Sequence, residues 1–518
     1  MGATFRESMD WLHTWAGLVV GVLLFAIFWT GTLCVFDREI DRWMNPSTRI
    51  VYSGEPIAID GLREEATRLS PRAAPWAIVL PTSRDPVLWI GYRARTGFER
   101  TLLDPLTMKP IAPAESWAGT RFFFPFHHTL HLKMWNLGTW LTGLAGAAMM
   151  ALCISGVIIH RKIFVDFFTL RRSRQPQRLL LDLHSTAGTL GFIFFFVMSF
   201  SGVTILASVY FPSGVWVAFD GGRSGYVKDT YDVFSRPRLN QPGPPLGSLD
   251  AMVASAREAW GGLNPGLVRV FHHGDRNSYV EVRPSIEAAV NMRTDPFFFD
   301  AATGEVLYRT YIRDTTQVQM FLTGLHFTQF RHWTLRWVYF ALGLLGCFLI
   351  VTGFLFWVER RRKAHLAAGS DAGRFVEGLA AGGTGGMVLA TLAFFVVNRL
   401  LPSGATFLGG VRYELEIWVF FGVWVLSFVH AWTRRTTAWI DQCWVAAALS
   451  VLAVALNGLT TGDHLFRALA DGKLAVAGMD LVLLAGAFAA ALTAWRLLRR
   501  RQSLNEPISH HRLEGQSP

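Results

Sequence analysis

The chain has 518 residues, of which 51% are hydrophobic and only 17% are charged. A soluble globular domain carries about a quarter charged residues, so this composition excludes an ordinary soluble protein. The formal net charge of +11 does not indicate nucleic-acid binding, because the basic residues cluster just beyond alternate apolar runs, where membrane orientation accounts for them. None of the four cysteines forms a CxxC or CxxCH pattern, so the sequence has no signature of covalent haem, zinc or an iron–sulfur cluster.

Eight apolar runs are each long enough to cross a hydrocarbon core of about 30 Å. They cover residues 11–36, 137–159, 183–210, 336–358, 376–400, 413–433, 441–460 and 477–498. The first run lacks a small-residue cleavage site, so we expect a retained span rather than a signal peptide. The sequence predicts an all-α, multi-pass protein of eight transmembrane helices, whose main partner is the lipid bilayer.

Basic clusters predict the orientation of these helices. They follow the second, fourth, sixth and eighth runs, within 161–182, at Arg360–Lys363, at Arg434 and Arg435, and at Arg499–Arg501. All four clusters fall on one side, which the positive-inside rule identifies as the cytoplasm. We therefore expect a bacterial inner-membrane protein with both termini in the cytoplasm.

The two long connecting segments are then expected in the periplasm. Each shows a short amphipathic helix, at 57–69 and 249–260, followed by strand-like segments and a turn, which predicts two small α+β domains. The expected organisation is a first transmembrane helix at 1–36, a periplasmic domain at 37–136, a second helix at 137–160, a basic loop at 161–182, a third helix at 183–210, a second periplasmic domain at 211–335, a fourth helix at 336–358, a four-helix module at 376–498 and a cytoplasmic tail at 499–518.

The first four spans contain an internal repeat. The pattern Leu-His followed by Ala-Gly and then by a hydroxyl-Gly pair begins at Leu12 and again at Leu183, at an offset of 171 residues. The separation from His13 to Gly31 and from His184 to Gly202 is 18 residues in both copies. The second and fourth spans match more weakly, since each has a tryptophan 16 residues before a glycine.

Histidines in membrane spans are costly and usually functional. They sort into two layers: His13, His184 and His160 near the cytoplasmic side, and His131, His326 and His127 near the periplasmic side. Two imidazoles in each layer predict one b-type haem per layer, and such closed iron coordination suits electron transfer.

The surroundings of these histidines leave alternatives open. Gly17 and Gly188, four residues after His13 and His184, leave room for a flat macrocycle, or they simply let helices pack closely. A supporting role for His127, beside the ligands, is as consistent as ligation. The cations that flank the periplasmic ligands, namely Arg121, Lys133, Arg331 and Arg336, suit haem propionates or serve as interface anchors.

These motifs, together with Asp300–Leu307 at the end of the second periplasmic segment, resemble the PepSY-associated transmembrane family over about residues 5–365. The resemblance implies an inner-membrane protein of iron uptake, similar to a dihaem ferric-siderophore reductase. Such an oxidoreductase would have a duplicated four-helix core with two b-type haems, would carry PepSY-like periplasmic domains, and would reduce Fe(III) in a siderophore to release Fe(II).

The chain departs from the family pattern in two places. Asp104-Pro-Leu-Thr stands where the family ending carries Thr-Gly, and the last four spans have no counterpart in the first half. These last spans could form a docking or quinone-contacting module. We expect Arg399, Arg412, Glu414 and Glu416 to mark the membrane interface there.

Two other functions stay open from the sequence. A non-enzymatic envelope regulator would restrain a peptidase through its PepSY units, and its histidines would be structural. A metal or haem transporter would use the eight spans as a pathway, although no span shows the broken helix pair with carboxylates typical of transport sites. The chain has neither a Walker motif nor a GxGxxG after a strand, so its electron donor would be quinol or a partner protein.

Overall fold

The computed structural model of the chain describes residues 4–70, 74–94, 97–160, 175–292, 295–434 and 437–505. Most of the basic loop predicted at 161–182, Arg435 and the end of the predicted cytoplasmic tail lie outside these residues. The chain divides into two compact units, Met1–Trp357 and Val358–Pro518. Each unit is considered by itself.

The described residues include eight helices that are long and apolar enough to cross a membrane, as the sequence predicted. They span Phe5–Cys34, Met134–Ile159, Pro176–Ile205, Trp333–Ala367, Ala372–Leu400, Arg412–Arg434, Ala438–Thr461 and Leu474–Ser503. The protein is therefore a multi-pass membrane protein. The third helix begins at Pro176, earlier than the apolar run at 183, because proline at the first turn of a helix loses no hydrogen bond.

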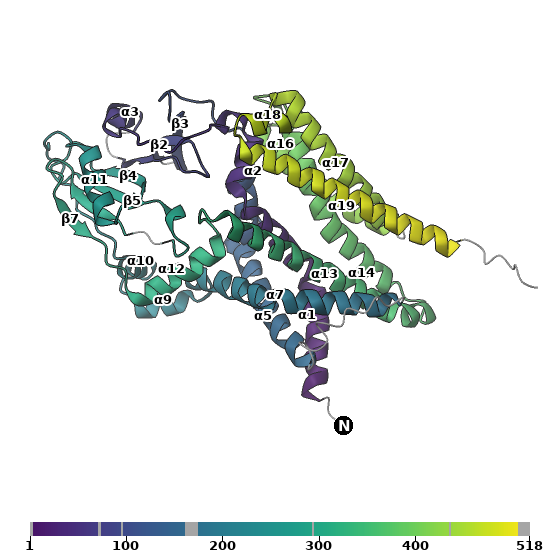
Figure 1. Cartoon of the computed structure of the whole chain (residues 1–518). Helices are drawn as coiled ribbons and strands as arrows, with labels where there is room; N and C mark the ends of the chain where they lie inside the picture. The colour runs from purple at the N-terminus through teal and green to yellow at the C-terminus, as the bar shows by residue number, and fades with distance from the viewer. Residues whose placement is uncertain are drawn as a thin grey trace, which may run out of the picture. The chain divides into compact units, whose positions relative to one another are not determined.

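In the first unit, four of these helices form a bundle (Figure 1). They are α1 (Phe5–Cys34), α5 (Leu137–Ile159), α7 (Pro176–Ile205) and α13 (Trp333–Ala367). A capping box between Thr4 and Glu7 begins α1, which satisfies backbone N–H groups at its free end. Leu24, Met149 and Phe195 are buried at the centre of the bundle. The middle of the bundle is therefore an apolar layer.

Shorter helices connect the bundle to the rest of the unit. They are α2 (Asp37–Met44), α3 (Arg63–Leu69), the π-helical turn η3 (Ala118–Phe123), α4 (Phe124–Thr129), α8 (Ala207–Tyr210), α9 (Pro212–Ala218), α10 (Arg223–Tyr231), α11 (Leu249–Ala259) and α12 (Asp314–Phe327). Both α4 and α12 end at a residue in the left-handed region, Leu130 and Thr328, each with φ of 50°. This conformation stops a helix and turns the chain sharply.

One antiparallel sheet of seven strands, in the order β3-β2-β1-β4-β5-β6-β7, combines both connecting segments. Its strands are β1 (Trp76–Val79), β2 (Leu88–Ala94), β3 (Gly97–Leu103), β4 (Pro265–Phe271), β5 (Tyr279–Pro284), β6 (Phe297–Asp300) and β7 (Val306–Arg309). Helices α3 and α11 contribute to the same hydrophobic core as the sheet (Figure 1). The sequence led us to expect two small domains; the structure instead forms a single sheet domain, because β1 pairs with β4 and leaves neither segment with a free inner edge.

The two halves of the sheet domain are related by a local two-fold axis. Ile78 of β1 pairs with Val268 of β4, and these residues are 190 positions apart. Asp60 and Asp250 are also 190 positions apart, and each accepts hydrogen bonds from the backbone N–H group at the start of the other's helix, Leu249 N and Ile59 N, at 2.8 Å. The helices thus cap each other across the axis, which fixes the pairing of the halves.

The turn that departs from the family pattern has the same geometry as its counterpart. Asp104 accepts hydrogen bonds from Leu106 N and Thr107 N, as Asp300 does from Ala302 N and Thr303 N. The chain then passes through the left-handed region at Met108 (φ 56°) and at Gly304 (φ 75°). The aspartate therefore makes this turn in both copies, and the first copy lacks only the glycine that relieves backbone strain.

The second unit contains the remaining helices. They are α14 (Ala372–Ala380), the π-helical turn η6 (Ala381–Gly385), α15 (Gly386–Leu400), α16 (Arg412–Arg434), α17 (Ala438–Thr461), α18 (Leu465–Ala470) and α19 (Leu474–Asn505), with a small hairpin of β8 (Thr406–Phe407) and β9 (Gly410–Val411). Helix α15 packs against α16 and α17, and α17 packs against α19.

Candidate functional site

Two histidines from the repeated motifs face each other in the bundle. His13 of α1 and His184 of α7 have ring centres 6.3 Å apart, with the ring planes at 87°. His160, at the end of α5, lies beside them, with its Nε2 3.5 Å from Ser185 Oγ. The structure therefore brings together the three histidines that the sequence placed in one layer.

A second pair lies toward the sheet domain. His127 of α4 and His326 of α12 have ring centres 5.9 Å apart, with the ring planes at 38°. His127 packs against α1 at Gly31, 18 residues from His13, which is about 27 Å of helix. The two pairs are thus near opposite ends of α1.

The sequence favoured His131 as the partner of His326, but the structure places His131 outside the pair. The chain turns at Leu130 and His131, which both have positive φ, and this directs the His131 ring away from His326. The ring stacks on Phe122 at 5.0 Å, and its Nε2 lies 3.0 Å from the Phe122 carbonyl oxygen. His127, one helical turn earlier, lies opposite His326 instead.

Each histidine of the two pairs has its Nδ1 in a hydrogen bond. The acceptors are Ser155 Oγ for His13, the Leu349 carbonyl for His184, the Ile27 carbonyl for His127 and Ser201 Oγ for His326, all at 2.9–3.0 Å. A carbonyl oxygen can only accept, and the hydroxyls of Ser155 and Ser201 donate their own protons to carbonyls one turn back. All four rings must therefore carry the proton on Nδ1.

This tautomer leaves the lone pair on Nε2, and Nε2 of these four rings makes no hydrogen bond to any described residue. Burial lowers the pKa of His127 to about 4, and burial together with the neighbouring His127 lowers the pKa of His326 to about 3. These rings are neutral at physiological pH. A neutral imidazole that is oriented through Nδ1 and has a free Nε2 is the form that ligates a metal.

A glycine on a neighbouring helix contacts each ring. A Cβ atom added to the glycine would lie 2.8 Å from His127 at Gly31, 2.9 Å from His326 at Gly202, 3.1 Å from His184 at Gly353 and 3.4 Å from His13 at Gly156. In all four cases the nearest ring atom is Cε1. The rings therefore occupy the space that any larger residue would need.

A buried hydroxyl residue precedes each of these glycines in the sequence. The four dipeptides are Thr30-Gly31, Ser155-Gly156, Ser201-Gly202 and Thr352-Gly353, and their hydroxyl residues are at most 2% exposed. We call each dipeptide with its histidine a histidine seat. Sequence analysis identified the first and third dipeptides but missed the other two, although Gly156 and Gly353 follow Trp140 and Trp337 at equal spacing.

Other residues predicted near the site lie differently. Gly17 and Gly188 do not contact a ring: their nearest neighbours for an added Cβ are Leu152 at 3.8 Å and Leu349 at 3.6 Å. That ordinary contact leaves the faces of α1 and α7 open beside the histidines. His128 has its Nδ1 2.8 Å from the Phe124 carbonyl oxygen of its own helix and does not join the pair.

Of the four cations expected near haem propionates, one is already engaged. Arg336 is fully buried and pairs with Glu39 at 2.8 Å. Arg121, Lys133 and Arg331 are exposed.

In the second unit, two carboxylates are buried between helices. Asn398 donates to Glu416 at 2.8 Å, and Asn457 donates to Asp480 at 3.4 Å, with all four residues at most 1% exposed. Glu416 thus lies inside the helix bundle, whereas the sequence led us to expect it at the membrane interface. Paired amides of this kind satisfy carboxylates between membrane helices.

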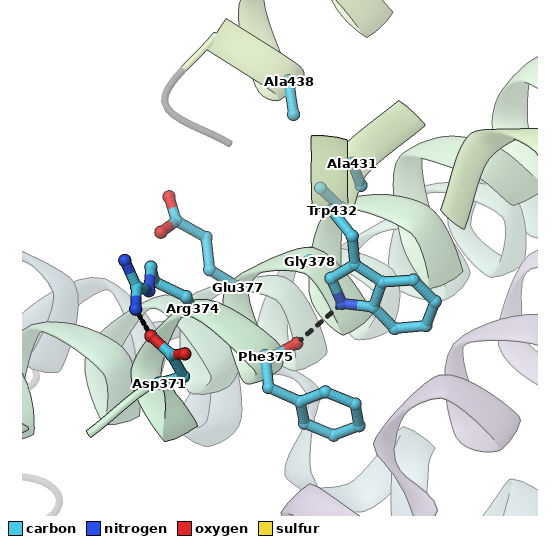
Figure 2. Close-up of a pocket in the computed structure, with 9 residues that line it drawn as sticks. Asp371, Arg374, Phe375, Glu377, Gly378, Ala431, Trp432 and Ala438 are labelled. Atoms are coloured by element: carbon cyan, nitrogen blue, oxygen red, sulfur yellow. Dashed lines mark hydrogen bonds and ion pairs between the residues drawn. The ribbon is translucent and has the colours of Figure 1, made fainter. Parts of the chain in front are cut away.

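The second unit also has an open pocket of about 210 Å³, shown in Figure 2. Phe375 stacks on Trp432, whose indole nitrogen donates to the Phe375 carbonyl at 3.3 Å. Its described lining contains no histidine. The two histidine pairs therefore remain the candidate site.

Comparison with known proteins agrees with this arrangement. The family described as PepSY-associated TM region matches residues 11–360, which include all four paired histidines. An uncharacterized protein of Pseudomonas aeruginosa is 26% identical over 408 residues, which is 73% of this chain and 94% of that protein. The chain belongs to the PepSY-associated transmembrane family.

Proposed function

We propose that the protein is a haem-containing electron-transfer protein of the bacterial inner membrane that reduces a ferric siderophore on the side of the sheet domain. The observation that carries this proposal is the set of four histidine seats. Each seat presents a neutral imidazole with Nδ1 donating and Nε2 free, and the seats face each other in two pairs.

The distances within each pair suit a shared iron. A transition-metal ion about 2 Å from each of two opposed imidazole nitrogens sets the ring centres about 6 Å apart. The observed separations are 6.3 Å and 5.9 Å. Bound b-type haem would supply a one-electron carrier at each pair.

The residues of the chain would have three roles in this process. The seats hold the imidazoles in the ligating tautomer, and the apolar layer around Leu24 and Met149 excludes water between the pairs. Phe28 and Phe195 lie in that layer with their rings 5.7 Å apart. The layer thus keeps polar solvent away from electrons that cross between the pairs.

Orientation follows from the basic clusters. The end of α13 carries Arg360, Arg361 and Arg362, which indicate the cytoplasmic side. Electrons from quinol or a partner protein would enter at the His13–His184 pair and leave from the His127–His326 pair. One electron converts the Fe(III) of the siderophore into Fe(II), which oxygen ligands bind less strongly.

The test is to purify the full chain in detergent, record its visible spectrum before and after dithionite, and count haem by pyridine haemochrome. We expect two haems per chain, and one haem in each of His13→Ala and His326→Ala. His131→Ala is the matched control and should keep both haems. A colourless protein after expression with ample haem would sink the proposal and favour the non-enzymatic regulator.

A further inference from the structure

Helix α2 follows α1 directly and carries acidic residues at alternate positions, Asp37, Glu39 and Asp41. Asp37 and Glu39 are 4% and 5% exposed. A helix with this pattern would be an ordinary solvated element if its carboxylates faced water. Here they contact other elements of the first unit, and each contact leads to a different part of the structure around the His127–His326 pair.

Glu39 joins the sheet domain to the bundle. Its Oε2 lies 3.1 Å from Arg84 Nη2, in the loop between β1 and β2, and 2.8 Å from Arg336 Nη2 at the start of α13. Both arginines also donate to the Val35 carbonyl at the end of α1, at 3.3 Å and 2.6 Å. Arg84 and Arg336 are 1% and 0% exposed, so this junction is dry.

Asp37 extends the junction to the helix of His326. Its Oδ1 accepts from Arg84 at 3.1 Å, and its Oδ2 accepts from Gln329 Nε2 at 3.4 Å. Gln329 in turn accepts from Arg84 Nη1 at 3.1 Å. Because Gln329 follows His326 by three residues, the loop of the sheet holds the end of α12 through two side-chain contacts.

Asp41 extends the same helix to the segment of His127. It accepts hydrogen bonds from the backbone and the hydroxyl of Thr120, in η3, which runs directly into α4. An added Cβ at Gly119 would lie 2.2 Å from the Asp37 carbonyl oxygen, so η3 and α2 touch through their backbones. Both histidines of this pair therefore depend on α2 for their position.

We propose that α2 couples the sheet domain to the His127–His326 pair, with Arg84 and Gln329 as positioning residues that set the angle and separation of the two imidazoles. A ligand that displaces the loop between β1 and β2 would then alter the redox properties of this pair and leave the His13–His184 pair unchanged. This inference rests on the proposed haem function, because it describes the regulation of the same site.

The experiment compares the two haems of the full-length protein in detergent, after His13→Ala and His326→Ala have assigned their signals. Electron paramagnetic resonance reports the angle between the two axial imidazole planes, and a redox titration reports each midpoint potential. In Arg84→Gln and Gln329→Ala we expect both readouts to shift for the haem assigned to His326 and to stay fixed for the other haem.

Arg313→Gln is the matched control. Arg313 precedes α12 and pairs with Asp229 at 2.9 Å, but the side chains are 59% and 46% exposed, so this substitution should move neither haem. If Arg84→Gln fails to fold, Gln329→Ala decides, since it removes only a neutral amide. Unchanged signals in folded Gln329→Ala, or equal shifts of both haems, would overturn the coupling and leave the proposed function intact; wild-type protein without haem would overturn both.

Discussion

The two histidine pairs use the same local chemistry on different scaffolds. The His13–His184 pair is held entirely by the long helices of the bundle, because its seats lie on α5 and α13. The His127–His326 pair sits on the short helices α4 and α12, which end in left-handed turns and contact the sheet domain through α2. The seat fixes the ligand in both cases, so the scaffold alone decides how far a distant domain can adjust it.

The strongest way to separate the pairs is to break the ion pairs of α2. Glu39→Gln would leave Arg84 and Arg336 without their shared carboxylate in a buried site. Removing one partner of a buried pair costs about 3–5 kcal/mol. We expect a large drop in melting temperature and preferential loss of the haem assigned to His326, measured by thermal unfolding and haem content. Equal loss of both haems would show that the pairs are not independent.

Alanine at the seat glycines should give graded effects that follow the contact distances. Gly31→Ala and Gly202→Ala place a methyl group 2.8–2.9 Å from a ring atom, whereas Gly156→Ala leaves 3.4 Å to His13. Overpacking of this kind costs about 1–3 kcal/mol. The first two variants should bind the haem assigned to His326 weakly, and Gly156→Ala should retain its haem. Haem titration of the purified variants measures the order, and a reversed order would contradict the seat geometry.

The serine acceptors distinguish one histidine within each pair. Ser155→Ala and Ser201→Ala remove the side-chain acceptors of His13 and His326, whereas His127 and His184 use backbone carbonyls that side-chain substitution leaves in place. Loss of a second-shell partner lowers metal affinity by about 10–100-fold. Each serine variant should weaken one haem only, and threonine at the same position should restore it. Weakening of both haems in a single variant would argue against separate layers.

The smallest expected effect is a pH dependence that arises at α2. Burial raises the pKa of Asp41 to about 7, so its ionisation makes folding less favourable as pH rises from about 4 to 7. Burial alone would raise the pKa of Glu39, but Arg84 and Arg336 outweigh it and lower that pKa to about 2. Glu39 therefore contributes stability that is lost only as pH falls from about 4.5 to 2.

Asp41→Asn removes one of these two dependences. Relative to wild type, the variant should lose the decline in melting temperature between pH 4 and 7 and keep the acid loss due to Glu39. Melting curves across this pH range check the difference. Identical pH profiles for the two proteins would show that Asp41 does not titrate in this window.

Sequence reasoning reached His13 and His184 because both lie in one motif at one spacing, and helical periodicity carries such motifs directly into space. It did not identify His127, because the sequence offers three histidines within five positions. The positive φ at Leu130 and His131 selects among them, and that backbone turn depends on packing against Phe122 and Phe126. The single sheet was also missed, since the pairing of β1 with β4 joins residues 190 positions apart.

The sequence by itself determined the eight spans, the family and the repeated His and hydroxyl-Gly motifs, because hydropathy and local spacing are properties of contiguous residues. Only the tertiary structure decided which histidine faces His326, which ring nitrogen carries the proton, and how α2 connects the sheet to one pair. Those features depend on contacts between distant segments, such as Arg84 with Gln329 or His127 with Gly31, whose geometry is set when the helices and the sheet pack together.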